Sequence, residues 1–330
     1  TVLYLLMWQL EAPFLGWVIA SILIGLGFTF FSGAVEAWLV DALNASGFDG
    51  EYETVFAKGQ TTLGVAMLVG SVAGGFVAQA TNLGVPYILR AVLLALTFVT
   101  AFFAMRDIGF TPRRGGRPVA EVRRVLTASL DNGWRKPPIR WLMLAAPFTG
   151  GVGVYAFYAL QPYLLELYGD PNAFGIAGMA AAIVAGAQIA AGLLVPLARK
   201  LFRTRTGMLA VSGVVSAAAL LAIGLTSSFW VAISLLVVWS LAFSISMPMR
   251  QSYLNGLIDS DQRATVLSFD ALMASSGGVV AQPALGRAAD VWSYSASYVL
   301  SSTIQVLAVP FVLLARREKA PSDPIEPANA

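Results

Sequence analysis

The 330-residue chain contains no cysteine and no histidine, and few of its residues are charged. Without cysteine and histidine it cannot build a disulfide, a Cys thiolate nucleophile, a Cys/His zinc site or a Ser-His-Asp relay. Most familiar catalytic sites are therefore excluded. The lack of cysteine is compatible with every cellular compartment and identifies none of them.

Charged residues make up 12% of the chain, against about 25% in soluble proteins, whereas apolar residues make up 57%. A soluble domain of this length would need far more charge to cover its surface, so most of this surface must face lipid. The composition therefore indicates an integral membrane protein.

Stretches of about 20 apolar residues are long enough to cross a hydrocarbon core of about 30 Å as helices. Nine such stretches alternate with short polar connections, which predicts an all-α membrane protein. Residues 1–10 look like the end of a tenth helix, and because the chain begins at Thr1 within an apolar run, we expect the start of that helix to be missing. The predicted spans are 15–40, 54–79, 86–105, 141–166, 174–198, 207–226, 229–249, 264–286 and 296–315.

The basic residues predict the orientation of these spans. All Lys and Arg residues except Arg90 and Arg287 fall at the connections on one predicted side or in the C-terminal tail. By the positive-inside rule this side, with the C-terminus, is cytoplasmic. We expect the protein in a plasma membrane, most simply a bacterial inner membrane. Because the basic residues are spread over separate loops, the net charge of +3 does not indicate a nucleic-acid partner.

One long connection, 106–140, divides the chain. Between Val119 and Leu130 four apolar residues recur at spacings of three and four, as in an amphipathic helix lying on the cytoplasmic leaflet. Four positions are too few to distinguish this helix from a solvated linker with accidental periodicity, so both interpretations stay open. The tail from Ala320 is Pro-rich and is predicted to be disordered. The predicted parts are the remainder of an N-terminal helical bundle (1–105), a central loop (106–140), a C-terminal six-helix bundle (141–319) and a disordered tail (320–330).

The two sides of this loop share a short motif. AWLVDAL at 37–43 aligns with QSYLNGL at 251–257, and ETVFAKG at 53–59 aligns with ATVLSFD at 264–270. Both matches lie where one predicted helix ends in the cytoplasm and the next returns. Two parallel helical repeats would leave such a pattern.

The chain resembles the major facilitator superfamily, the twelve-helix secondary transporters. The resemblance covers nearly the whole chain and implies that it corresponds to the end of helix 3 through helix 12, without helices 1 and 2. It also implies two pseudo-symmetric helical bundles around a central site. The segments that carry it are GLGFTFFSGAVEAWLVDAL (25–43), GVAMLVGSVAGG (64–75), QPYLLELYG (161–169), LARKLFRTRTG (197–207), RATVLS (263–268) and PALGRAAD (283–290).

Two positions depart from the proton-driven drug exporters of this superfamily. Ser21 stands where their fourth helix usually has an arginine, and the glycine-rich segment 64–75 lacks their proline. These departures weigh against a drug/proton antiporter but leave the resemblance to the superfamily intact.

Four ionisable side chains inside the predicted spans are candidates for gating or coupling, because charge within a membrane is costly. Glu36 and Lys58 lie level with each other, about 7 Å inside the cytoplasmic boundary at 1.5 Å rise per residue. The repeat aligns Glu36 with Arg250, and Lys58 within one residue of Asp270. We therefore expect the pairs Glu36–Lys58 and Arg250–Asp270, with Asp41 at the cytoplasmic helix end nearby. The alternative is a Glu36–Arg250 gate across the mouth, which would leave both charges unpaired when open.

Uncharged polar residues within the spans are candidates for a substrate cavity. Tyr155, Tyr158 and Gln161 follow at i, i+3 and i+6 on one predicted helix and could share a face. Aromatic side chains with few charges suit a lipophilic or weakly cationic substrate. For each residue the alternative is a hydrogen bond that only joins two helices. The candidates are Ser32, Tyr155, Tyr158, Gln161, Gln188 and Ser244.

Together these features predict a secondary active transporter of efflux type that moves a small solute by alternating access. An ion gradient, with the proton as the candidate ion, or the solute's own gradient would drive it, and no cofactor or metal is expected. A non-transporting sensor or receptor on the same fold stays open. An integral-membrane enzyme is less favoured, because no cluster of catalytic side chains is apparent in the sequence.

Overall fold

The computed structural model describes residues 1–9, 13–31, 38–39, 42–43, 45–47, 52–105, 127, 133–258 and 263–325. The chain divides into two compact units, Thr1–Gly115 and Gly116–Ala330, which are described separately. Among the described residues the regular elements are helices, and the one β feature is an isolated bridge between Thr204 and Pro324.

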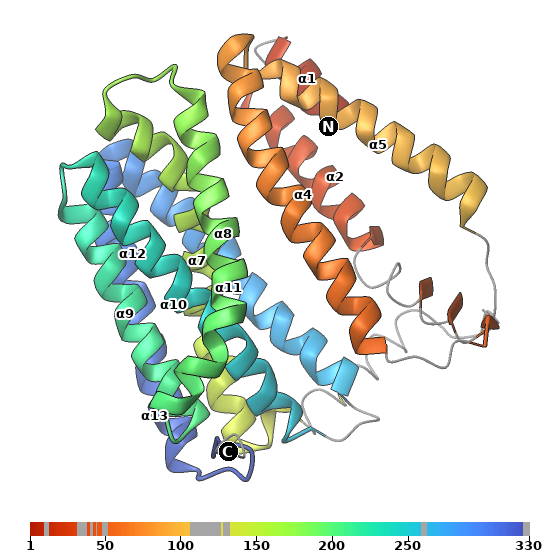
Figure 1. Ribbon diagram of the computed structural model, residues 1–330. Coiled ribbons are helices and arrows are strands. Elements are labelled where there is room, and N and C mark those ends of the chain that lie inside the picture. The colour runs from red at the N-terminus through yellow and green to blue at the C-terminus, as the bar shows by residue number, and fades with distance from the viewer. Residues whose placement is uncertain are drawn as a thin grey trace. The chain divides into compact units, whose positions relative to one another are not determined.

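The first unit is a set of apolar helices. The helix α5 lies against α1 and α4, and α1 also lies against α2 (Figure 1). Large apolar side chains on these helices are exposed, among them Phe14, Val69 and Phe103. Such exposure is expected of helices whose surroundings are lipid. The helices are α1 (Val2–Gln9), α2 (Phe14–Phe31), α4 (Tyr52–Ala80) and α5 (Gly84–Ala104).

The second unit is a helical bundle in which α7 is central. This helix contacts α8, α10, α11, α12 and α13, while α9 packs against α10, α12 and α13 (Figure 1). Two buried clusters fill the bundle, one around Tyr155, Tyr163 and Tyr298, the other around Met143 and Tyr253. The helices are α7 (Pro137–Tyr168), α8 (Phe174–Leu201), α9 (Arg205–Leu225), α10 (Phe229–Asn255), α11 (Arg263–Val291), α12 (Tyr294–Val306) and α13 (Ala308–Arg317).

Local sequence signals explain several helix ends. Prolines at the first two positions begin α7, where a missing N–H costs nothing, and Gly169 ends it with a left-handed φ of 82°. The side chain of Thr204 accepts a hydrogen bond from Gly207 N at the start of α9, and that of Ser293 does the same from Ala296 N at the start of α12.

The helices α7 and α11 cross very closely because glycines line the crossing. A Cβ added at Gly277 would overlap the backbone of Pro147, and one added at Gly151 would overlap the backbone of Gly277. Only glycine fits where two backbones approach this closely.

Seven described segments are long and apolar enough to cross a membrane. They are Thr62–Ala80, Gly84–Ala104, Pro137–Tyr168, Phe174–Ala191, Arg205–Leu225, Phe229–Asn255 and Tyr294–Arg317. The all-helical membrane architecture is confirmed, but the predicted number of nine spans is not. The helix α2 contributes a shorter apolar stretch, Phe14–Gly27, and α11 carries Asp270 and Arg287 along its length.

The last long apolar segment is interrupted. The helices α12 and α13 are separated at Leu307, whose backbone remains right-handed helical. Three residues further on, Pro310 has no backbone N–H to donate to the carbonyl of Val306. The proline therefore weakens the helix at this point, and the predicted span 296–315 becomes two helices.

The prediction of a disordered tail is wrong for residues 320–325. Asp323 is buried, and its carboxylate accepts hydrogen bonds from Thr206 N and Thr206 Oγ1, both at 2.8 Å. Arg205 donates to the carbonyls of Ser322 and Pro324. The proline content of the tail predicts disorder, whereas hydrogen bonds to the start of α9 and to Arg205 keep the tail in place. Residues 326–330, and the predicted amphipathic helix within 106–140 apart from Thr127 and 133–140, lie outside the described residues.

We expect Asp323→Ala to lower the free energy of unfolding by about 1–2 kcal/mol, since the start of α9 loses a capping carboxylate and Thr206 loses both partners. Thermal and denaturant unfolding of the purified protein measure the change. The matched control is Asp290→Ala, which removes an exposed carboxylate at the end of α11 and should change stability by no more than about 0.5 kcal/mol. Equal effects of the two substitutions would show that the tail contributes nothing.

Candidate functional site

A bidentate ion pair joins α10 to α11 inside the second unit. Arg250 Nη2 donates to Asp270 Oδ1 at 2.6 Å, and Arg250 Nη1 donates to Asp270 Oδ2. The side chain of Asp270 is 9% exposed and that of Arg250 is 22% exposed. A planar guanidinium matches both carboxylate oxygens at once, so this geometry gives strength as well as orientation.

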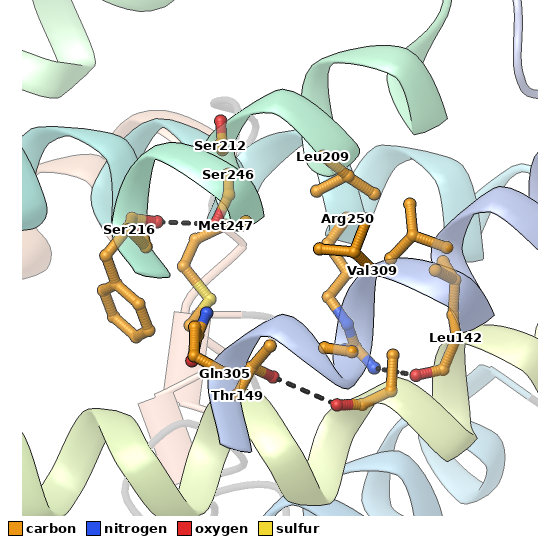
Figure 2. A pocket seen from close by; sticks show the side chains of 15 residues that line it. Leu142, Thr149, Leu209, Ser212, Ser216, Ser246, Met247, Arg250, Gln305 and Val309 are labelled. Atoms are coloured by element: carbon orange, nitrogen blue, oxygen red, sulfur yellow. Dashed lines mark hydrogen bonds between the residues drawn. The ribbon is translucent and has the colours of Figure 1, made fainter. Parts of the chain in front are cut away.

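The ion pair also involves α7. Arg250 Nη2 donates a further hydrogen bond to the carbonyl oxygen of Leu142 at 3.2 Å, drawn in Figure 2. That carbonyl lies within α7, five residues before Pro147, and its neighbour Met143 is fully buried. One guanidinium therefore connects α7, α10 and α11 through a charged hydrogen-bond network.

The structure thus gives Arg250 its charged partner within its own unit. The corresponding N-terminal residues cannot be compared, because Glu36 and Asp41 lie outside the described residues and Lys58 is described only as a residue of α4, without its side chain. Neither the Glu36–Lys58 pair nor the alternative Glu36–Arg250 gate is therefore tested, and both stay predictions.

A pocket of about 70 Å³ with a mixed polar and apolar lining lies beside Arg250, within the second unit. Figure 2 shows Arg250 and Leu142 on one side of this pocket and Ser216 and Gln305 on the other. The helices α7, α9, α10, α12 and α13 all contribute to it. Its polar lining consists of Thr149, Ser212, Ser216, Ser246, Arg250 and Gln305, and its apolar lining includes Leu142, Leu209, Phe243, Met247, Val309 and Val312.

The sequence predicts a functional role for Arg250 but not for the other polar residues of the pocket. Gln305 is an uncharged amide within a predicted span, so the rule that selected Gln161 and Gln188 applied to it equally. The sequence offered no reason to prefer these serines to Ser32 and Ser244, because a helical Ser usually bonds to its own backbone. Ser246, for example, donates to the carbonyl of Phe243 at 2.7 Å.

The predicted cavity residues do not gather at this pocket. Tyr155 is buried, donates to Ser297 Oγ at 2.6 Å and packs against Tyr298, with ring centroids 6.3 Å apart. Tyr158, in contrast, is 66% exposed, and Gln161 is half-buried. The expectation that these three share one face is wrong, because each step of three residues turns the side chain by about 60° around the helix.

The remaining predicted cavity residues are placed only in part. Ser244 is half-buried on α10 and does not line the pocket. The side chain of Gln188, on α8, and the whole of Ser32 lie outside the described residues. Whether any of the six predicted residues binds a substrate therefore stays a prediction.

Comparison with known proteins places the chain in a family. The family model of the Major Facilitator Superfamily matches residues 1–281 and, in a second overlapping match, 188–330. No curated relative matches the chain. Together the two matches extend over all 330 residues, and they agree with the all-helical architecture and its long apolar helices. The chain is therefore an integral membrane transporter rather than an enzyme, and it belongs to the Major Facilitator Superfamily.

Proposed function

We propose that this transporter is a secondary active permease of efflux type that moves a small solute by alternating access. The observation that carries the proposal is the Arg250–Asp270 ion pair, because ionised groups within membrane helices mark coupling and gating elements more often than structural ones. Neither the composition nor the described helices suggests a nucleotide site, so an ion gradient is the natural source of energy.

Asp270 is the described carboxylate best suited to respond to an ion gradient. Protonation would remove the negative charge of the Asp270 carboxylate, which would then accept hydrogen bonds from Arg250 only weakly. The hydrogen bond from Arg250 to the carbonyl of Leu142 would remain. The contact between α10 and α11 would then loosen, which is the kind of switch that alternating access needs. Glu36 would have the matching role in the other repeat, with Asp41 at its helix end.

The substrate class follows from the polar residues on α7. Tyr158 presents an exposed aromatic ring, and Gln161 lies one turn further along the same helix. An aromatic surface with few charges accommodates lipophilic or weakly cationic molecules. We therefore propose such a solute, with the proton as the coupling ion, in a plasma membrane with the C-terminus in the cytoplasm.

The test is growth of a host that expresses the full-length protein on a panel of toxic lipophilic cations, followed by direct efflux measurements with the compound that it resists. We expect resistance and an energy-dependent efflux that a protonophore abolishes. Resistance that persists after the protonophore collapses the gradient would contradict ion coupling. Resistance to no compound at all would favour a sensor or receptor on the same fold.

We expect Gln161→Ala to reduce the initial rate of efflux by about tenfold, the loss that follows when one well-placed hydrogen bond of about 1.4 kcal/mol is removed. The amount of protein in the membrane should not change. Gln282→Ala, an exposed glutamine on α11, is the matched control and should leave the rate unchanged. An unchanged rate with Gln161→Ala would remove this residue from the proposed site.

A further inference from the structure

The pocket beside Arg250 contains polar side chains without a hydrogen bond to any residue that the structure describes. Gln305 is 5% exposed and Ser216 is 2% exposed, and both line the pocket. Among the hydrogen bonds of the described residues, none involves the side chain of Gln305, Ser212 or Ser216. Amides and hydroxyls in a protein interior are nearly always hydrogen-bonded to protein or to ordered water, so these groups call for a partner beyond the described residues.

The volume of the pocket limits what that partner is. About 70 Å³ of room is available, and one water molecule needs roughly 10–15 Å³ of such room. Several water molecules therefore fit. Drug-sized ligands occupy pockets of roughly 300–1,000 Å³, so a transported solute of that size does not fit.

The charge beside the pocket also disfavours a bound ion. Arg250 would repel a cation, and its charge is already matched by Asp270, so a second anion would gain little. An apolar occupant, such as a lipid chain, would leave the amide of Gln305 unsatisfied. Water both donates and accepts, so it can bind every polar group that lines the pocket.

The interruption between α12 and α13 is a second observation that favours water in the pocket. Gln305, Ala308, Val309 and Val312 line the pocket from both sides of the break at Leu307. A break in a transmembrane helix is tolerated where the backbone is buried in protein or faces a water-filled cavity. The pocket lies directly beside this interruption.

We propose that this pocket is an internal hydration site, in which ordered water molecules bind Gln305, Ser212 and Ser216 and solvate the Arg250 guanidinium. Water at this position gives Arg250 alternative hydrogen-bond partners within the membrane, so the Arg250–Asp270 pair can open at lower cost than in a dry bundle. The site is separate from the proposed substrate residues on α7.

Two variants of the full-length purified protein test the hydration site without a transport assay. If the site is hydrated, Gln305→Leu removes the amide to which the water molecules bind and leaves their hydrogen bonds unsatisfied. We then expect Tm to fall by about 2–4 °C. In a dry site the same change would remove an unsatisfied amide and raise Tm. Gln282→Leu makes the same change at an exposed position on α11 and corrects for the general effect of the substitution.

The second variant is measured by difference infrared spectroscopy against the unsubstituted protein, in which a thiol introduced among these 330 cysteine-free residues gives its own S–H band. We expect Ser216→Cys to exchange S–H for S–D in D₂O roughly tenfold faster than Ala217→Cys, because its thiol contacts water. Ala217 is equally buried but does not line the pocket. A higher Tm with Gln305→Leu, or a Ser216→Cys thiol that exchanges no faster than the control, would overturn the proposal.

Discussion

Asp270→Asn should destabilise the protein by about 3 kcal/mol, because it leaves the partly buried guanidinium of Arg250 without a counter-charge. The asparagine keeps the size of the side chain but accepts at one oxygen only, so the bidentate contact between α10 and α11 is lost. Thermal unfolding of the detergent-solubilised protein measures the loss. In proteoliposomes the same variant should also lose efflux if Asp270 couples the ion gradient to transport.

The double variant Arg250→Met/Asp270→Leu separates the cost of an unpaired charge from the value of the pair. Replacing both partners by apolar residues of similar size should recover most of the lost stability. Ser275→Ala, an exposed position on α11, is the control and should change stability by no more than about 0.5 kcal/mol. If the double variant is no more stable than Asp270→Asn, the pair is not the source of the effect.

Gly277→Ala should be the second strongly destabilising change. The added Cβ would overlap the backbone of Pro147, and neither backbone can move aside without separating α7 from α11. We expect a loss of about 2–3 kcal/mol, at the upper end of the usual cost of overpacking. Thermal unfolding and the fraction of protein recovered in folded form are the measurements.

Gly286→Ala is the matched control on the same helix, because a Cβ added there meets no atom within 4 Å. Alanine is the better helix former, so this variant should be neutral or more stable by up to about 1 kcal/mol. The prediction for Gly277 is contradicted if both substitutions have the same sign. The contrast would locate the constraint in the α7–α11 crossing rather than in glycine itself.

The sequence predicted the features that depend on composition and on spacing along the chain. Low charge and long apolar runs were sufficient for the membrane architecture, since both follow from the cost of placing polar groups in lipid. The short repeat between 37–43 and 251–257 led to the suggestion that Arg250 pairs with Asp270, and the structure shows these two residues bonded.

The features that escaped prediction depend on contacts between distant segments. The tail at 320–325 is held by backbone amides of α9, which no composition reveals. Tyr155 and Tyr158 were grouped by spacing, but whether each side chain faces the core depends on how α7 is rotated against α12. The pocket near Gln305 exists because five helices meet there, and only their packing defines its volume.

The most direct test of alternating access is a counterflow measurement with the full-length protein in liposomes, made with the first compound of the cation panel that it moves. The liposomes are loaded with unlabelled compound and diluted into a trace of labelled compound. Alternating access predicts that labelled compound accumulates transiently above its equilibrium level, because exchange is faster than net flux. Labelled uptake that is the same in loaded and unloaded liposomes would contradict the proposed mechanism.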